Sequence, residues 1–527
     1  MSSDLIVLIP ILIPLVGAFL VWGIGRVKED AGAIATAVIS GLTLVSVGWI
    51  YSVVNNTEAI SLKLDVGIPN IPLFFRADSL GLFLSLVTCF VWVLASIYAI
   101  EYIGKRKTLF NVFLLFSLYG MLGINLTGNL YSLLLFFEFF SVASAVLVMH
   151  EGTKQAMRAG FQYLFMSIVG SVAVIFAVAI IWWLTGTTDL TGTGIEGLTN
   201  GPLGIALFWL LILGFAIKAG MFPVHVWLPV AHPIAPSPAS ALLSGVMIKA
   251  GAYGMIRIVY GIFGIDVVSN VFMIKTLMVL AVITMILGSV LALTQTEIKR
   301  LLAYSSVAQI GYVILGITLL NVNGFAGGVL HIFNHALMKG ALFLAAGAVI
   351  HQTGLREIKD FKGLGKRMPL TMAAFTMAAL SMIGVPPFIG FFSKWLLGLG
   401  ALDAGSLGLI TPFYAYVIVG AIVLSGLLNI VYYGPILMNG WFRDPEGEIS
   451  PPHAHPQPVL ATDGGHVVDD DVHGHGDEEK VKVDQVEPSW VMSVPTLTLA
   501  LGTLVFGFYI HLPMRLVENV IGMYLRG

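Results

Sequence analysis

The chain has 527 residues, of which 57% are hydrophobic and only 11% are charged, and its formal net charge is −2. This composition excludes an ordinary soluble multidomain protein, and the charge balance provides no basic surface for nucleic acid. Cys89 is the only cysteine, which excludes an intrachain disulfide, a cysteine-ligated iron–sulfur cluster and a CxxCH haem site.

Apolar blocks of about 20 residues follow one another along the chain, and each is long enough to cross the hydrocarbon core of a bilayer. The first block has no basic leading region and no small-residue cleavage site, so we expect it to stay as the first span. The pattern predicts an all-α polytopic membrane protein with about fourteen transmembrane helices, over residues 4–25, 31–54, 77–101, 108–127, 130–150, 160–185, 204–230, 238–262, 270–293, 301–320, 325–351, 369–400, 411–438 and 489–513.

The basic residues are divided unequally between the loops. If the N-terminus lies outside, the loops assigned to the cytoplasm hold 17 Lys and Arg residues, and the opposite loops and tail hold 4. Loops rich in Lys and Arg stay in the cytoplasm. We therefore expect a protein of the cell membrane with both termini outside the cytoplasm.

Residues 439–488 form the one long hydrophilic stretch, which is rich in Pro, Gly, Asp and His. This composition predicts a flexible cytoplasmic loop. His466, His473 and His475 lie near the acidic run 469–471 and could bind a divalent metal, but their spacing matches no defined zinc site. We favour disorder here and assign no metal site.

At least five charged residues lie well inside predicted spans, where each costs roughly 2.5–3.5 kcal/mol on insertion scales and needs a partner or a pathway. The five that we single out are Glu138, Lys218, Lys249, Lys339 and Lys394. The simpler explanation is that each belongs to a static ion pair or reaches a lipid headgroup. One central acid cannot pair with four lysines, however. A buried lysine without a counter-charge favours its neutral form, so it can take up and release a proton.

Two predicted spans carry the residues of interrupted helices. The seventh contains AGMFPVHVWLPVAHPIAPSP with Lys218 just before it, and the twelfth contains SMIGVPPFIGFFSKW with Lys394 at its end. Proline removes a helical donor and leaves carbonyls free, and many transporters build midplane ion sites at such breaks. Ordinary proline kinks are the alternative. Two lysine-bearing breaks five helices apart suggest an inverted repeat, because an odd offset reverses the direction of the helices.

The predicted organisation has five parts: residues 1–103 with helices one to three, 104–262 with the first five-helix repeat, 263–438 with the second, 439–488 as the loop and 489–527 with the last helix. Within the second repeat, His331, His335 and Lys339 are spaced by four and share one helix face. Histidine titrates near neutral pH, so this face is a candidate proton relay. His225 and His232 beside the first break are weaker candidates, and each of these histidines could instead serve packing.

Several long motifs occur between residues 75 and 435: FFEFFSVASAVLV, FAIKAGMFPVHVWLPVAHPIAPSPASALLSGVMIKAGAYG, QTEIKRLLAYSSVAQIGY, HIFNHALMKGALF and GVPPFIGFFSKW. Through them the chain resembles the antiporter-like membrane subunits shared by respiratory complex I, energy-converting membrane-bound hydrogenases and Mrp-type Na⁺/H⁺ antiporters. The resemblance implies fourteen helices with two inverted five-helix repeats. It also implies a role for each charge: Glu138 as gating carboxylate, Lys218 as first-half carrier, Lys249 as bridge, Lys339 as second-half carrier and Lys394 as exit-side residue.

A few positions indicate which members of this subunit family the chain resembles more. Lys394 stands where some complex I members carry glutamate, and Glu297 stands where many relatives carry aspartate. The tail stops soon after Arg515, without the long lateral helix of the largest complex I relative. The stretch before the second break looks closest to Mrp D-type and hydrogenase-linked members.

We therefore expect a proton-translocating subunit that works with other membrane subunits, without a redox centre or cofactor of its own. Na⁺ exchange for H⁺ stays open, because Na⁺ ligands require geometry rather than spacing. A self-sufficient secondary transporter is the main alternative, and a structural subunit with retained charges is the third.

Overall fold

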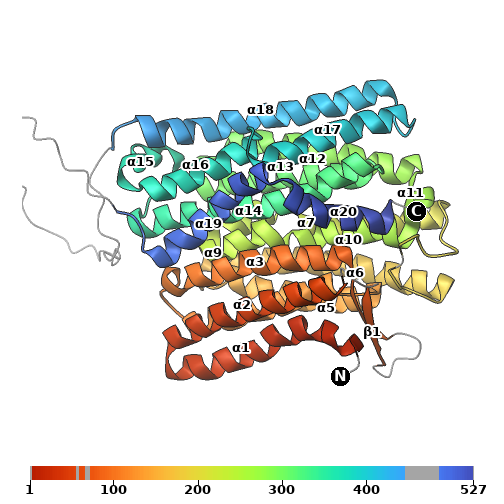
Figure 1. Cartoon of the computed structure of the whole chain (residues 1–527), viewed down its shortest axis with the longest axis horizontal. Helices are drawn as coiled ribbons and strands as arrows, with labels where there is room; N and C mark the ends of the chain where they lie inside the picture. The colour runs from red at the N-terminus through yellow and green to blue at the C-terminus, as the bar shows by residue number, and fades with distance from the viewer. Residues whose placement is uncertain (1–2, 55–58, 66–71, 191, 446–485, 526–527) are drawn as a thin grey trace, which may run out of the picture.

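The molecule is a bundle of long apolar helices whose axes run in roughly one direction (Figure 1). The structure, a computed structural model, describes residues 3–54, 59–65, 72–190, 192–445 and 486–525. Within these ranges, 13 helical segments are long and apolar enough to cross a membrane. Both described ends of the chain lie at the same end of the bundle, which we call the terminal end (Figure 1).

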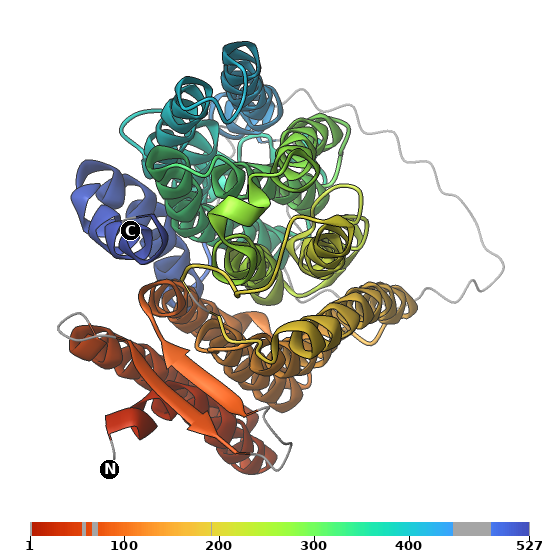
Figure 2. The ribbon, with the colours of Figure 1, turned by 90° about the vertical axis from the view of Figure 1, so that its right-hand side faces the viewer.

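The N-terminal part contains a short β-hairpin that the all-α prediction missed. β1 and β2 pair antiparallel, with Ile60 opposite Ala77 and Leu64 opposite Leu73. The hairpin lies across one end of the N-terminal helices (Figure 2). The elements of this part are a 3₁₀ turn (Ser3–Leu8), α1 (Ile9–Val27), α2 (Glu29–Val54), β1 (Ile60–Leu64), β2 (Leu73–Ala77) and α3 (Ser79–Tyr102).

The next part contains the first interrupted helix. α7 ends at Ala219 because Gly220 adopts φ 75°, and helical structure resumes only at Leu228. The following span is helical from Ser237 to Val268 but includes two π-helical segments. The helices here are α4 (Lys107–Asn125), α5 (Leu130–Val148), α6 (Lys154–Thr185), α7 (Pro202–Ala219), α8 (Leu228–Ile234), α9 (Ser237–Leu242), the π segment η2 (Leu243–Met247), α10 (Lys249–Ile256), the π segment η3 (Arg257–Phe263) and α11 (Gly264–Val268).

The third part contains the second interruption. The predicted span 369–400 is two helices rather than one, since α16 ends at Ile383, Gly384 takes φ 93°, and Pro386 and Pro387 occupy the gap before α17. The helical segments are the π segment η4 (Val271–Lys275), α12 (Thr276–Leu293), α13 (Ile298–Thr318), α14 (Val322–Thr353), a 3₁₀ turn (Ile358–Phe361), α15 (Leu364–Arg367), α16 (Pro369–Ile383), α17 (Ile389–Ser406) and α18 (Pro412–Phe442).

The C-terminal part is two helices, whereas a single span over residues 489–513 was predicted. α19 (Trp490–Phe508) ends before that span does, and α20 (His511–Tyr524) follows it. One side of α20 is buried through Pro513, Val517 and Ile521. The described chain therefore ends in a short helix packed on the bundle, which the hydropathy pattern did not separate from the last span.

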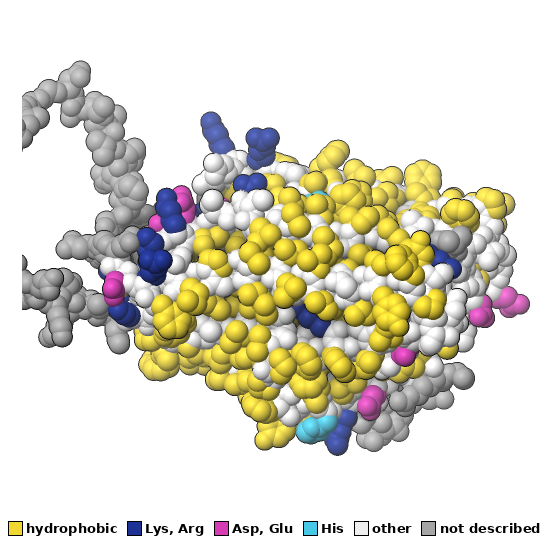
Figure 3. All heavy atoms as spheres, turned by 90° about the horizontal axis from the view of Figure 1, so that it is seen from above, with side chains coloured by type: hydrophobic (Ala, Val, Ile, Leu, Met, Phe, Trp, Pro, Cys, Tyr) yellow, Lys and Arg dark blue, Asp and Glu magenta, His cyan; other side chains and the backbone are white. Residues whose placement is uncertain are grey.

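The core of the bundle is built from the helices that carry the charged motifs. In α14 and in the span Ser237–Val268 the apolar window is wholly buried, whereas that of α18 is 33% buried. Small residues allow close helix crossing, as where a Cβ on Gly316 of α13 would lie 2.5 Å from Gly328 Cα of α14. On the face drawn in Figure 3, hydrophobic side chains cover most of the middle, and most of the charged side chains lie toward the two ends.

Candidate functional site

Lys218 occupies the last turn of α7, where the first interruption begins. Its Nζ donates hydrogen bonds to Ser141 Oγ, at 2.8 Å, and to the hydroxyl of Tyr163. The amine also lies 4.5 Å from the ring centroid of Phe140. Aromatic faces and hydroxyl oxygens stabilise a cation without holding it as tightly as a carboxylate does. This environment can hold the ammonium form and can also release its proton.

Glu138 lies on α5 near this lysine and contributes to its electrostatic surroundings. Its Oε1 is buried and has no hydrogen-bond partner. Among the ion pairs of the described residues, none within 4.0 Å joins Glu138 to Lys218. The carboxylate therefore acts on the amine electrostatically, without an ion pair between the two groups.

Lys249 contacts the predicted histidine face directly. Its Nζ lies 2.5 Å from His335 Nδ1 and donates to the Ser244 carbonyl at 2.6 Å. Ser244 belongs to the π segment η2, which ends just before Lys249 and leaves this carbonyl available. His335 Nε2 is buried without a partner. The structure thus joins a lysine of one span to a histidine of another, and leaves the second ring nitrogen free to exchange a proton.

His331 continues this contact along α14. The rings of His331 and His335 stack with centroids 6.2 Å apart and an interplanar angle of 13°. His331 Nε2 donates to Gln309 Oε1 at 2.9 Å, and its Nδ1 lies 2.9 Å from Ser393 Oγ. The two histidines therefore lie on one face, as predicted, and lead from Lys249 toward α17.

Lys339 lies one turn further along α14 and contacts a separate group of oxygens. Its Nζ donates to the Leu302 carbonyl at 2.9 Å, to Ser305 Oγ, and to the Tyr433 hydroxyl at 3.4 Å. Its side chain is fully buried. Because Lys339 has hydroxyl partners like those of Lys218, the two predicted carriers occupy chemically similar sites in the two halves of the chain.

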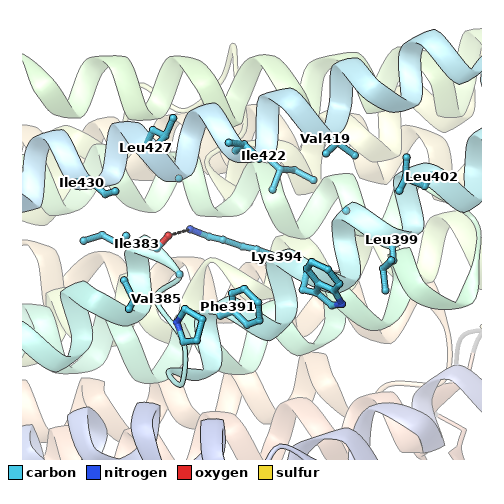
Figure 4. Close-up of a pocket in the computed structure, with 16 residues that line it drawn as sticks. Ile383, Val385, Phe391, Lys394, Leu399, Leu402, Val419, Ile422, Leu427 and Ile430 are labelled. Atoms are coloured by element: carbon cyan, nitrogen blue, oxygen red, sulfur yellow. Dashed lines mark hydrogen bonds between the residues drawn. The ribbon is translucent and has the colours of Figure 1, made fainter.

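Lys394 reaches back into the second interruption. Its Nζ donates to the carbonyls of Met382, at 2.7 Å, and Ile383, at 3.0 Å, which α16 leaves free where it ends (Figure 4). The ring of Tyr312 lies 5.2 Å from this amine and 5.2 Å from the His331 ring. A largely apolar cavity of about 520 Å³ between α17 and α18 borders the lysine.

The two weaker candidates occupy the first interruption. His225 precedes α8, and its Nδ1 is buried without a partner. His232 is fully buried on α8, both of its ring nitrogens lack hydrogen-bond partners, and it stacks on Phe343. Lys249, Lys299 and Lys339 all act electrostatically on His232, which places it among the central lysines.

Several polar residues of this region were not predicted from the sequence. Lys299, assigned to a cytoplasmic loop, is 3% exposed and donates to the Ala235 carbonyl. The serines and tyrosines that bind the lysines were not singled out either, although Ser141 lies one turn beyond Glu138 in the sequence. That spacing was a usable signal, whereas Tyr163 and Tyr433 come from helices whose position only the tertiary structure determines.

The described contacts connect some predicted residues and leave a gap. Lys249, His335, His331 and Lys394 follow one another through the contacts above. Within the part of the chain that the structure describes, the hydrogen-bond partners of Lys218 are not shared with Lys249. The helices that carry Lys218 and Lys249 pack closely beside these lysines, since a Cβ on Gly251 would lie 2.5 Å from Ala219 N.

The described residues contain no group of three or more His, Cys, Asp or Glu side chains placed to hold a metal ion. His466, His473, His475 and the acidic run 469–471 lie outside the described residues. The candidate site consists of amines, imidazoles, hydroxyls, one carboxylate, the Gln309 amide and several backbone carbonyls.

A family model described as NADH:quinone oxidoreductase/Mrp antiporter, TM, matches residues 127–419, which is more than half of the chain. The chain belongs to this family. It is an ion-translocating, antiporter-like, multi-pass membrane subunit of the kind found in complex I, hydrogenase and Mrp antiporter complexes. The matched residues include all five of the charged residues that were singled out within the predicted spans.

Individual relatives agree with this membership. The antiporter-like chain is 37% identical to the N-type NADH-quinone oxidoreductase subunit of Desulforudis audaxviator over 375 residues, 69% of this chain and 72% of that protein. It is 32% identical to the D-type Na(+)/H(+) antiporter subunit of Alkalihalophilus pseudofirmus over 404 residues, 75% of this chain and 80% of that protein. A chain of the Mrp complex from Dietzia sp. DQ12-45-1b superimposes with a TM-score of 0.84 at 25% identity, covering 100% of this chain and 98% of that one.

Proposed function

We propose that the chain transfers protons near the bilayer midplane along Glu138, Lys218, Lys249, His335, His331 and Lys394, with Lys339 as the carrier beside the histidines. The observation that carries the proposal is that the four lysines are buried and hydrogen-bonded but not ion-paired. Each is at most 8% exposed, and each donates to hydroxyls, carbonyls or a histidine, while the ion pairs of the described residues include none of them. An amine held in this way can be protonated or neutral at modest cost.

We further propose fourteen crossings arranged as two inverted five-helix repeats. Neither α16 nor α17 is among the 13 helical segments that are long and apolar enough to cross a membrane. They follow one another across the second break, so we count them together as a fourteenth crossing. An even number of crossings agrees with both described chain ends lying at the terminal end. The unequal distribution of Lys and Arg supports a terminal end outside the cytoplasm.

The chain is proposed to work inside a multi-subunit membrane complex, either the pumping arm of a redox enzyme or the core of an antiporter. The relatives include subunits of both kinds, and one similar chain was solved within an Mrp complex. Purification of the tagged chain from its native membrane in mild detergent, with mass spectrometry of its partners, distinguishes them. Partners with iron–sulfur clusters, flavin or nickel indicate the redox enzyme, and small cluster-free membrane subunits indicate the antiporter. Transport by the isolated chain in liposomes contradicts both.

The proton pathway itself is tested at Lys218. Arginine keeps a positive charge and a long stem but does not deprotonate in proteins, whereas alanine removes the charge. Proton uptake is measured in vesicles that carry the complete complex. It should fall about 100-fold when the complex contains Lys218→Arg or Lys218→Ala, because each substitution removes the exchangeable proton.

The matched control is Lys359→Arg at the exposed pair between Lys359 and Glu357, 2.9 Å apart, which should transport normally. Assembly of each variant is checked by native gel and mass spectrometry. Normal transport by assembled Lys218→Arg contradicts the pathway, since a fixed charge would then be sufficient.

A further inference from the structure

A second buried charge cluster lies outside the proposed pathway. Arg257 Nη2 donates to Asp78 Oδ1 at 2.7 Å, and the side chains are 0% and 4% exposed. Asp78 also accepts from Gly81 N at 2.9 Å and so caps α3. The pair joins the start of α3 to the π segment η3, which begins at Arg257.

Two further residues, Tyr524 and Arg76, contact the Arg257–Asp78 pair. Arg257 Nη1 donates to the hydroxyl of Tyr524 at 2.8 Å, and Tyr524 is the last residue of α20. Arg76 Nε lies 3.9 Å from Asp78 Oδ2. Two guanidinium groups therefore surround one carboxylate, which leaves an excess of positive charge at this point. The C-terminal helix that the sequence-based prediction missed supplies the hydroxyl that covers it.

Arg257 shares a helix face with Lys249 of the proposed pathway. Lys249, Tyr253 and Arg257 follow one another at intervals of four residues through α10 and the start of η3. At 1.5 Å per residue, Arg257 lies about 12 Å along the axis from Lys249, toward the terminal end. Tyr253 is fully buried between them and donates to the Asn125 carbonyl at 3.1 Å.

The polar groups of this face are not fully satisfied by protein. Arg257 Nε, Asp78 Oδ2 and both amide atoms of Asn125 are buried without hydrogen-bond partners. Buried polar atoms of this kind are commonly met by internal water. A face with a lysine at one end, a tyrosine in the middle and unsatisfied polar groups at the other is a route by which water and protons could pass from Lys249 to the terminal end.

A purely structural tie is the simpler explanation of the pair. Burying two charges is costly, however, and apolar residues of similar volume often stabilise a protein as well or better. A fixed arginine, by contrast, repels protons and other cations from a narrow polar route, as in channels that exclude them. The excess positive charge favours this second role.

We propose that the Arg257–Asp78 pair, covered by Tyr524, is an electrostatic barrier that closes the terminal end of the helix face bearing Lys249, so that ions leave the midplane line past Lys394. Arg257, Asp78 and Tyr524 are positioning residues in this role, because they touch neither the moving proton nor its carriers. The inference rests on the proposed pathway through Lys249.

The test is a passive leak measured on the assembled complex. The double variant Asp78→Asn with Arg257→Met removes both charges, keeps a residue that can cap α3 and keeps an unbranched side chain of similar length. Vesicles with the native complex are given a pH gradient without an energy source, and its collapse is followed with a pH-sensitive dye. We expect the double variant to leak about tenfold faster than wild type, and adding Lys249→Ala to restore a tight vesicle.

The matched control neutralises an exposed ion pair near the hairpin. Lys63 and Asp189 are 2.7 Å apart with side chains 52% and 31% exposed, and Lys63→Met with Asp189→Asn should remain tight. Tyr524→Phe removes one hydroxyl and keeps the ion pair. Its vesicles should lose the pH gradient faster than wild type but more slowly than those of the double variant, and adding Lys249→Ala should abolish this leak. Tyr524→Phe provides the test if the double variant does not assemble.

Tight vesicles in the assembled double variant, or in Tyr524→Phe where only that variant assembles, overturn the barrier. A leak that persists with Lys249→Ala also overturns it, because the route would then bypass the lysine. Failure of the proposed pathway is detected separately, as normal proton uptake by Lys218→Arg in the energised transport assay. That result does not depend on the leak measurement.

Discussion

Lys249 and His335 are 86 residues apart in the sequence, yet Lys249 Nζ and His335 Nδ1 lie 2.5 Å apart in the centre of the bundle. Both side chains are at most 1% exposed. Two basic groups at this distance in a low-dielectric interior disfavour carrying a proton each. We therefore expect that a proton arriving at one group promotes release from the other, which is how the proposed pathway would use this contact.

His335→Asn tests this contact. Asparagine offers an oxygen that can accept from Lys249 but cannot titrate, so the variant keeps a hydrogen bond and loses the proton carrier. We expect proton transport in vesicles to fall about 100-fold while assembly is retained. His511→Asn at an exposed histidine of α20 is the control and should transport normally. Equal transport by the two variants would show that His335 serves packing.

Glu138→Gln tests the carboxylate next to Lys218. Because Glu138 Oε1 is buried without a partner, the amide fits without breaking a described hydrogen bond at that atom, but it cannot attract the ammonium. Transport should fall by about two orders of magnitude, and Glu138→Asp should recover part of it. Glu357→Gln on the surface is the control. Full activity of Glu138→Gln would remove the gating role from this position.

Two substitutions of Lys394 distinguish an effect on stability from an effect on transport. Lys394→Met leaves the carbonyls of Met382 and Ile383 without the lysine donor, which should lower the free energy of unfolding by about 1–3 kcal/mol in addition to stopping transport. Lys394→Arg still donates but does not release a proton, so its thermal unfolding should stay near wild type while proton uptake is lost. Thermal unfolding of the purified complex and vesicle transport are measured side by side. Active Lys394→Arg would exclude proton transfer here.

Glu487→Gln is predicted to affect stability alone. Glu487 accepts from Leu370 N and Thr371 N at the start of α16, at 2.5 and 3.2 Å, and from Thr371 Oγ1 at 2.8 Å. The charged cap also interacts favourably with the helix dipole. Its loss should cost roughly 1 kcal/mol, read as a lower unfolding temperature, with transport unchanged. A transport defect without destabilisation would instead connect this cap to the pathway.

The helix face shared by His331, His335 and Lys339 was predictable because periodicity along one helix needs no knowledge of its neighbours. The same holds for the two interruptions, where Gly220 and Gly384 end helices through their positive φ angles. The partners of the lysines were not predictable in this way. Tyr163 and Tyr433 contact Lys218 and Lys339 from other helices, and their meeting depends on how those helices cross.

By itself, the sequence determined the membrane class, the approximate spans, the family and the five charged residues singled out within those spans, since each follows from local composition or a contiguous motif. The tertiary structure decided which charges meet. It buried Lys299, which was predicted to lie in a loop, paired Asp78 with Arg257, and placed Tyr524 at the end of α20 against that pair. The physical reason is that hydropathy reports how well a segment tolerates lipid, whereas a buried hydrogen bond depends on the position of a second helix that hydropathy does not encode.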